Sequence, residues 1–201
     1  MSARNLFDLT GKVALITGGS RGLGLQMAKA LGDMGARVAI SARKADELAE
    51  AKTQLTARGI DVLTVTNDLG RPEGIPALVD GVVAHFGTID ILVNNAGATW
   101  GAPAEDTPLE AWDKVMNLNI RSIFLMSQAV GKASMIPRRQ GRIINIASIA
   151  GLSGSWIVLS TRTTHWFIER GFAEADISRL PGRKQSLYNY ERRSKIFMKG
   201  L

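Results

Sequence analysis

The sequence predicts an α/β protein with a doubly wound parallel sheet, helices on both faces, and a fold that is truncated after the fifth strand. Short apolar runs alternate with amphipathic segments at the spacing of right-handed β-α-β units, whose strands are parallel. The runs are hydrophobic almost throughout, as expected for strands that helices cover on both sides. No further strand and helix of this kind follows residue 152.

Five strands are predicted, each bounded by a turn or a helix. The first, KVALIT, leads into a glycine-rich turn, and the fourth, IDILVNNAG, runs into a polar turn. The predicted strands are residues 12–17, 37–41, 61–66, 89–97 and 141–148.

Helices are predicted between these strands. The segment KADELAEAKTQLTARG ends at Gly59, and the third helical segment begins with an early proline and ends with a glycine. We expect the fourth segment to form two helices, with a break near Asn117–Asn119. The helical segments are residues 25–36, 44–59, 72–87 and 108–135. A further helix is possible near 164–175.

Composition excludes several kinds of site. The chain has 201 residues, enough for one domain with a core, and contains no cysteine, so disulfides and thiolate metal sites are excluded. His85 and His165 are the two histidines and lie far apart in sequence, so we expect no metal site. No signal peptide or membrane-spanning run is expected, which favours a cytoplasmic protein without a membrane partner.

The net charge of +7 belongs mainly to the end of the chain. Residues 1–156 carry 16 Lys and Arg against 14 Asp and Glu, whereas residues 157–201 carry 9 against 4. The stretch GRKQSLYNYERRSK combines basic residues with two tyrosines that could stack on bases. Short basic tails are usually solvated, so nucleic acid is not our expected partner.

The first predicted strand and helix enclose the turn TGGSRGLG. Gly18 and Gly22 permit a tight turn with close backbone approach, and Gly24 lets the helix pack on the strand. The helix N-terminus offers free N–H groups and a partial positive charge to a pyrophosphate. A glycine turn can be purely structural, but its place between strand and helix favours dinucleotide binding.

The spacing T-G-x-x-x-G-x-G resembles the short-chain dehydrogenase/reductase family. NNAG at 94–97 and WDKVMNLNI at 112–120 share this resemblance, which runs from about residue 8 to residue 155. The overall amino-acid sequence is similar to those of the subgroup of gluconate 5-dehydrogenases and 3-oxoacyl carrier-protein reductases. The resemblance implies a Rossmann fold and hydride transfer between a nicotinamide cofactor and an alcohol or carbonyl substrate.

The second strand favours NADP over NAD. An acidic residue at this strand end would bind the ribose 2′-hydroxyl of NAD, but here Ser41, Ala42 and Arg43 follow. Arg43 and Arg21 could pair with a 2′-phosphate, although both could instead be merely solvated. The residues expected to bind the cofactor, several of them implied by the resemblance, are Thr17, Gly18, Ser20, Arg21, Gly22, Leu23, Gly24, Ser41, Arg43, Asp68, Leu69, Asn95, Ala96 and Gly97.

The resemblance implies two catalytic residues in this chain. Ser148 matches the serine that holds the carbonyl oxygen, and Asn119 matches the asparagine that supports a water relay. Taken alone, a strand-end serine and a helix-break asparagine would be structural. Reduction also needs a proton donor, which in this family is a tyrosine with a lysine four residues later.

That tyrosine is missing from the expected place, about a dozen residues after Ser148. Residues 160–162 read Ser-Thr-Arg, and the only tyrosines are Tyr188 and Tyr190. Arg192 and Ser194 follow them by four residues, and Lys195 follows Tyr190 by five. On a helix, a spacing of five turns two side chains about 140° apart, so Lys195 cannot easily replace the family's lysine.

We therefore predict a dinucleotide-binding domain at 1–155 and an atypical basic tail at 156–201. The tail is either disordered or the product of a frameshift, an inserted element or a sequencing error. Such a tail lacks the family's last strands and the helix that usually builds its homo-oligomer interface. The open edge beside the fifth strand and the apolar face of 119–135 would lose their cover, so we predict low stability and aggregation.

The sequence is compatible with two functions. The first is an NADP-dependent oxidoreductase acting on a small molecule such as a sugar acid, polyol or 3-oxoacyl compound, with activity impaired by the missing Tyr-x-x-x-Lys pair. The second is a catalytically inactive NADP-binding protein or a gene remnant.

Overall fold

The computed structural model describes residues 6–102, 104–147, 156–160, 168, 173–179 and 195–199. The chain divides into two compact units, Met1–Ile146 and Ala147–Leu201. The first unit contains a parallel sheet, and the second contains an antiparallel one.

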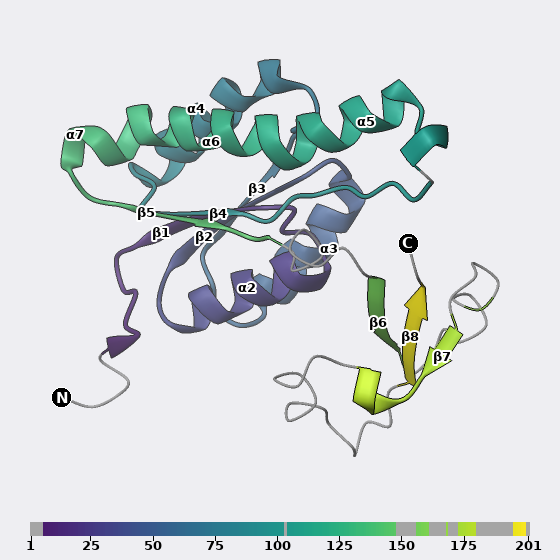
Figure 1. The fold of residues 1–201 in the computed structure, drawn as a ribbon. Coiled ribbons are helices and arrows are strands. Elements are labelled where there is room, and N and C mark those ends of the chain that lie inside the picture. Colours follow the sequence, from purple (N-terminus) through teal and green to yellow (C-terminus); the bar gives the residue numbers. More distant parts are fainter. Residues whose placement is uncertain are drawn as a thin grey trace. The chain divides into compact units, whose positions relative to one another are not determined.

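Five parallel strands form the sheet of the first unit in the order β3-β2-β1-β4-β5 (Figure 1). The order reverses between β1 and β4, which creates a switch point at the carboxyl ends of these two strands. The strands are β1 (Val13–Thr17), β2 (Arg37–Ala42), β3 (Val62–Thr66), β4 (Ile91–Asn94) and β5 (Arg142–Asn145).

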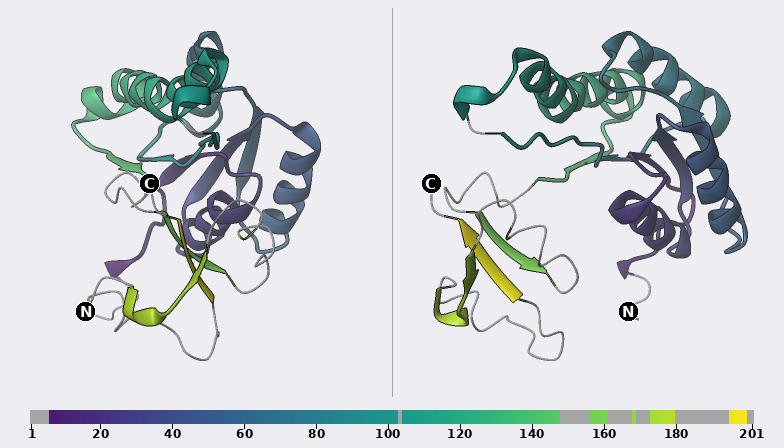
Figure 2. Two further views of the ribbon diagram at one scale, coloured as in Figure 1. Left: turned by 45° about the vertical axis from the view of Figure 1, so that its right-hand side comes forward. Right: turned by 90° about the vertical axis from the view of Figure 1, so that its right-hand side faces the viewer.

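Helices cover both faces of this sheet, and the predicted fold class is confirmed. Figure 1 and Figure 2 show α4 and the long helix from α5 to α7 on the face opposite α2. The elements are α2 (Gly22–Asp33), α3 (Ala45–Thr56), η1 (Pro72–Gly74), α4 (Ile75–Phe86), η2 (Ala104–Asp106), α5 (Leu109–Met116), η3 (Asn117–Arg121), α6 (Ser122–Val130), η4 (Gly131–Met135) and α7 (Ile136–Arg138).

The core has two layers because successive residues of a strand point to opposite faces. In β1, Val13 and Leu15 pack with α4, α6 and η4, whereas Ala14 and Ile16 pack with α2 and α3. All four side chains are fully buried, which explains why this strand is apolar throughout.

The predicted break near Asn117–Asn119 is wrong, because the helix continues there as the π-helical turn η3. A π turn widens the helix by one residue without ending it. The two asparagines therefore mark a change from α-helical to π-helical geometry within one continuous helix.

An ion pair between a buried carboxylate, Asp90, and a partly exposed guanidinium, Arg138, ties the end of the long helix to the sheet. One carboxylate oxygen of Asp90, which is 6% exposed, accepts a hydrogen bond from the N–H of Val13 at 3.0 Å. The other accepts from the guanidinium of Arg138 at 3.0 Å. Asp90, which directly precedes β4, therefore connects this strand to β1 and to α7.

The described residues of the second unit form three antiparallel strands in the order β6-β8-β7 and a 3₁₀ turn. These elements are β6 (Trp156–Ser160), β7 (Ala173–Ala175), β8 (Lys195–Lys199) and η6 (Ile177–Arg179). The helix predicted near 164–175 is wrong at its end, where β7 pairs with β8. Its other residues, apart from Ile168, lie outside the described residues. The predicted division at 155 and 156 stays a prediction.

Apolar side chains lie exposed on the helix and strand that the sequence predicted to lose their cover. Ile143 and Ile144 of β5 are 42% and 44% exposed, and Phe124 of α6 is 63% exposed. Within the described sheet, β5 has hydrogen bonds only to β4. Exposed apolar groups beside an unpaired strand edge favour association of chains.

We therefore expect the double variant Phe124→Glu, Ile144→Lys to aggregate more slowly than the wild type. Light scattering at 37 °C should show a reduction in initial rate of about fivefold or more, because both substitutions place charge on the exposed surface. The matched control is Leu23→Glu, which charges an exposed apolar residue on α2. A wild-type chain that stays a soluble monomer and melts cooperatively above 50 °C would contradict the prediction.

Candidate functional site

A pocket of about 330 Å³ opens at the carboxyl ends of β1, β2, β3 and β4. Every residue predicted to bind the cofactor lines it except Thr17. The strands are parallel, so the segments that follow them converge on one edge of the sheet, at the switch point.

Two glycines of the first turn let backbone segments beside the pocket pack closely. Gly18 has φ +64°, and a Cβ there would lie 3.0 Å from Cα of Ala96. A Cβ on Gly24 would collide with the carbonyl oxygen of Gly18 and lie 2.6 Å from Nδ2 of Asn95. Both positions therefore require glycine for the close approach of two backbone segments.

The first turn of α2 gives this pocket a positive electrostatic end. Its N-cap is Arg21, without a side-chain cap, and the turn contains no acidic residue. The first N–H groups of a helix have no partners within the helix and carry part of its positive dipole. Gly22, Leu23 and Gly24 of this turn line the pocket, so it is suited to an anion.

Thr17 and Asn95 join the ends of β1 and β4. The hydroxyl of Thr17 accepts hydrogen bonds from the backbone N–H groups of Asn95 and Ala96 at 3.0 and 3.1 Å. The amide of Asn95 donates to the carbonyls of Thr17 and Gly18 at 3.0 and 3.2 Å. Thr17 is 1% exposed, and its contacts show that it supports the site from below.

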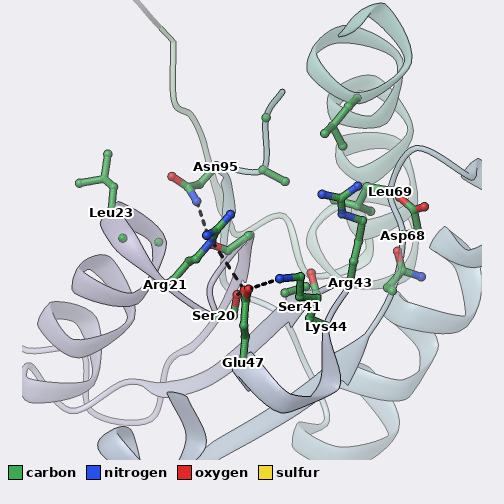
Figure 3. Close-up of a pocket in the computed structure, with 18 residues that line it drawn as sticks. Ser20, Arg21, Leu23, Ser41, Arg43, Lys44, Glu47, Asp68, Leu69 and Asn95 are labelled. Atoms are coloured by element: carbon green, nitrogen blue, oxygen red, sulfur yellow. Dashed lines mark hydrogen bonds and ion pairs between the residues drawn. The ribbon is translucent and has the colours of Figure 1, made fainter. Parts of the chain in front are cut away.

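Glu47 from the first turn of α3 holds two basic residues at one wall of the pocket (Figure 3). It pairs with Lys44 at 2.9 Å and with Arg21 at 3.6 Å, and it accepts a hydrogen bond from Ser20 at 3.1 Å. The hydrogen bond from Lys44 is the main cause that lowers the pKa of Glu47 below 4.5. The carboxylate is therefore ionised at neutral pH.

Polar atoms without protein partners also face this pocket. Arg43 forms no ion pair within the described residues, and Figure 3 shows it on the side of Asp68 and Leu69. The hydroxyl of Ser41 and Oδ1 of Asn67 are buried without a hydrogen-bond partner in the same part of the chain. Unpaired buried polar atoms are costly, and a polar ligand would satisfy them.

Asp68 has a structural role in addition to its place in the pocket. Its carboxylate accepts a hydrogen bond from the N–H of Gly70 at 3.0 Å, as a turn aspartate does. The neighbouring Leu69 is 6% exposed and belongs to the core below α4.

Asn119 lies in η3 and is paired with the segment after β4. Its Oδ1 accepts from the N–H of Ala98 at 2.8 Å, and its Nδ2 donates to the carbonyl of Ala98 at 2.8 Å. This reciprocal pair fixes the backbone beside Gly97. Ser148, the other predicted catalytic residue, lies outside the described residues, as do Tyr188 and Tyr190.

Sequence reasoning missed five residues that line the pocket, namely Ala42, Lys44, Glu47, Asn67 and Leu118. Lys44 and Glu47 had a visible signal, because residues three apart at the start of a helix lie on one face. Glu47 also brings a carboxylate to the pocket wall beside the end of β2. The strand end itself carries none, but α3 supplies one.

In the described part of the chain, no three histidine or acidic side chains are close enough to hold a metal ion. No helix in these ranges is long and apolar enough to cross a membrane.

Comparison with known proteins identifies relatives along the first three quarters of the chain. The model of the family "short chain dehydrogenase" matches residues 12–160. A 2-dehydro-3-deoxy-D-gluconate 5-dehydrogenase of Escherichia coli is 47% identical over 149 residues, which are 74% of this chain and 58% of that protein. A rhamnolipid-biosynthesis 3-oxoacyl-[acyl-carrier-protein] reductase of Pseudomonas aeruginosa is 42% identical over 150 residues, 73% of this chain and 58% of that protein.

A solved structure has the same fold. A metagenomic short-chain oxidoreductase in complex with NADP is 38% identical, with a TM-score of 0.69 over 72% of this chain and 66% of the other. This chain therefore spans less than two thirds of the length of these relatives. The family match covers the sheet and every residue of the pocket, and the chain belongs to the short-chain dehydrogenase family.

Proposed function

We propose that this chain binds NADP(H) in the pocket at the carboxyl ends of β1 to β4. The observation that carries the proposal is Arg43, which follows β2 where a carboxylate would favour NAD and has no ion pair among the described residues. The NADP-bound relative supports the choice of cofactor.

The residues present suit this cofactor. The first turn of α2 would bind the pyrophosphate, and Gly18 and Gly24 let the turn, the helix and the segment after β4 pack closely together. Arg43 would pair with the 2′-phosphate, and the unpaired hydroxyl of Ser41 lies in the same pocket. When bound, the cofactor would supply or accept the hydride for an alcohol or carbonyl substrate.

The substrate class follows from the relatives only in outline. We propose a sugar acid, polyol or 3-oxoacyl compound, since relatives and solved structures similar to this chain are named as dehydrogenases or reductases of such substrates. Ser148 would hold the carbonyl oxygen. Asn119 would keep the backbone at Ala98 and Gly97 in place, and its amide retains one N–H for a water.

Impaired turnover forms part of the proposal. No tyrosine occurs between Ser148 and Tyr188, so the proton donor expected near 160–162 is replaced by Ser-Thr-Arg. A hydroxyl of serine or threonine is a much weaker acid than a phenol and donates poorly without a base. The second candidate function, an NADP-binding protein without turnover, is favoured by this same absence.

We expect the wild-type chain to bind NADPH, and Arg43→Ala to weaken that binding about tenfold, because a charge-assisted pair to a phosphate is lost. NADH affinity should change less than twofold. Titration followed by NADPH fluorescence measures both, and Lys52→Ala on an exposed face of α3 is the matched control. Equal losses for NADPH and NADH would contradict the assignment of Arg43.

Turnover separates the two candidate functions. A chain that binds NADPH and oxidises it with a 3-oxoacyl or keto-sugar-acid substrate is an oxidoreductase, and a chain that binds without oxidation is a binding protein. Sequencing the gene from codon 140 past the stop, in three frames, adds an independent test. A Tyr-x-x-x-Lys in another frame, about a dozen codons after Ser148, would identify a damaged reductase.

A further inference from the structure

The wall of the pocket at the start of α3 contains a negatively charged side chain. Glu47 lines the pocket with its side chain 23% exposed, and its carboxylate contacts Ser20, Arg21 and Lys44. Figure 3 shows these contacts converging on the carboxylate between the glycine turn and the residues after β2. Two segments that would receive a ligand phosphate, the glycine turn and the start of α3, are thus already joined by an internal carboxylate.

This arrangement divides the positive charges of the pocket into two groups. Arg21 and Lys44 are paired with Glu47, whereas Arg43 has no ion pair among the described residues. A phosphate entering the pocket therefore meets one unpaired guanidinium. To gain the other two cations it must displace the carboxylate of Glu47 or approach it.

Displacing the carboxylate of Glu47 and approaching it both weaken the binding of a ligand with an additional phosphate. Displacement breaks two ion pairs and a hydrogen bond from Ser20, and approach places like charges together. A ribose with a free 2′-hydroxyl meets neither cost, because it carries no charge at this position. The same side chain thus acts differently on NADPH and NADH.

We propose that Glu47 is a specificity-determining residue that limits the preference of this pocket for the 2′-phosphorylated cofactor. This inference rests on the proposed function, because it requires that the pocket bind a nicotinamide dinucleotide. It assigns opposite effects to two neighbouring residues, since Arg43 favours the 2′-phosphate and Glu47 opposes it.

The test is Glu47→Gln, which removes the charge and keeps the shape of the side chain. NADPH should bind about tenfold more tightly than to the wild type, because repulsion between like charges a few ångströms apart at a partly exposed site has this size. NADH affinity should change less than twofold, and in 0.5 M salt the gain should fall below threefold, since salt screens exposed charges. Fluorescence titration measures all three quantities without turnover.

Glu50→Gln is the matched control, because Glu50 is an exposed acidic residue on the same helix that does not line the pocket. It should change neither affinity. Adenosine 2′,5′-bisphosphate, used as a competitor, should show the same gain in the Glu47 variant, whereas 5′-AMP should not, which places the effect at the 2′-phosphate. Circular dichroism confirms that each variant is folded.

The outcomes distinguish the inference from the proposed function. If the wild type binds neither dinucleotide at millimolar concentration, the proposed function and the inference both fail. If it binds NADPH but Glu47→Gln leaves the ratio of the two affinities unchanged, the inference alone fails. Weaker NADH binding with unchanged NADPH binding also overturns it, because Glu47 would then recognise the 2′-hydroxyl.

Discussion

A Gly24→Ala variant is expected to lose NADPH binding by at least about a hundredfold and about 2 kcal/mol of stability. The added Cβ would collide with the carbonyl oxygen of Gly18 and lie 2.6 Å from Nδ2 of Asn95. Both neighbours belong to the framework of the pocket, so the helix must move away from the turn. Titration with NADPH and urea unfolding measure the two effects.

The matched control is Gly81→Ala in α4, where an added Cβ would meet nothing within 4 Å. Alanine favours a helix interior by up to about 1 kcal/mol over glycine, so this variant should be equal to or more stable than the wild type, with unchanged binding. Near-normal NADPH binding by the Gly24 variant would show that the turn adapts, contrary to our explanation.

An Asp90→Ala variant is expected to lose about 2 kcal/mol of unfolding free energy and about 6 °C in Tm. The N–H of Val13, a fully buried residue, would lose its acceptor, and Arg138 would lose its carboxylate partner. Most of this loss comes from the buried N–H of Val13, because the side chain of Arg138 is 35% exposed and can bind water instead. Thermal and urea unfolding followed by circular dichroism measure the loss.

Asp80→Ala is the control for charge removal, since Asp80 is exposed on α4. It should change stability by less than about 0.5 kcal/mol. An Asp90 variant as stable as this control would mean that water replaces the carboxylate at Val13 and Arg138.

Much of the fold could be predicted from local patterns. The all-apolar strand at 13–17 is buried on both faces, and the glycine at 87 ends α4 with φ +83°, as its position after the apolar run indicated. The continuity of the long helix could not be predicted, because two asparagines look alike in a break and in a π turn. The partner that decides between them is Ala98, which lies 21 residues away.

The pocket could be predicted wherever a motif fixes the backbone, as at Gly18, Gly24 and Asn95. It could not be predicted where a side chain reaches in from a helix. Glu47 lies five residues beyond the end of β2, and its contact with Ser20 joins residues 27 positions apart. Such a contact depends on how α3 crosses the sheet, which local sequence does not specify.

Every residue of the pocket lies between Gly18 and Leu118, before the last strand of the parallel sheet and before the second unit begins. The pocket residues, 18–118, and the segment expected to carry the proton donor, near 160–162, are thus encoded by different parts of the gene. Selection can therefore retain one while the other decays or is exchanged.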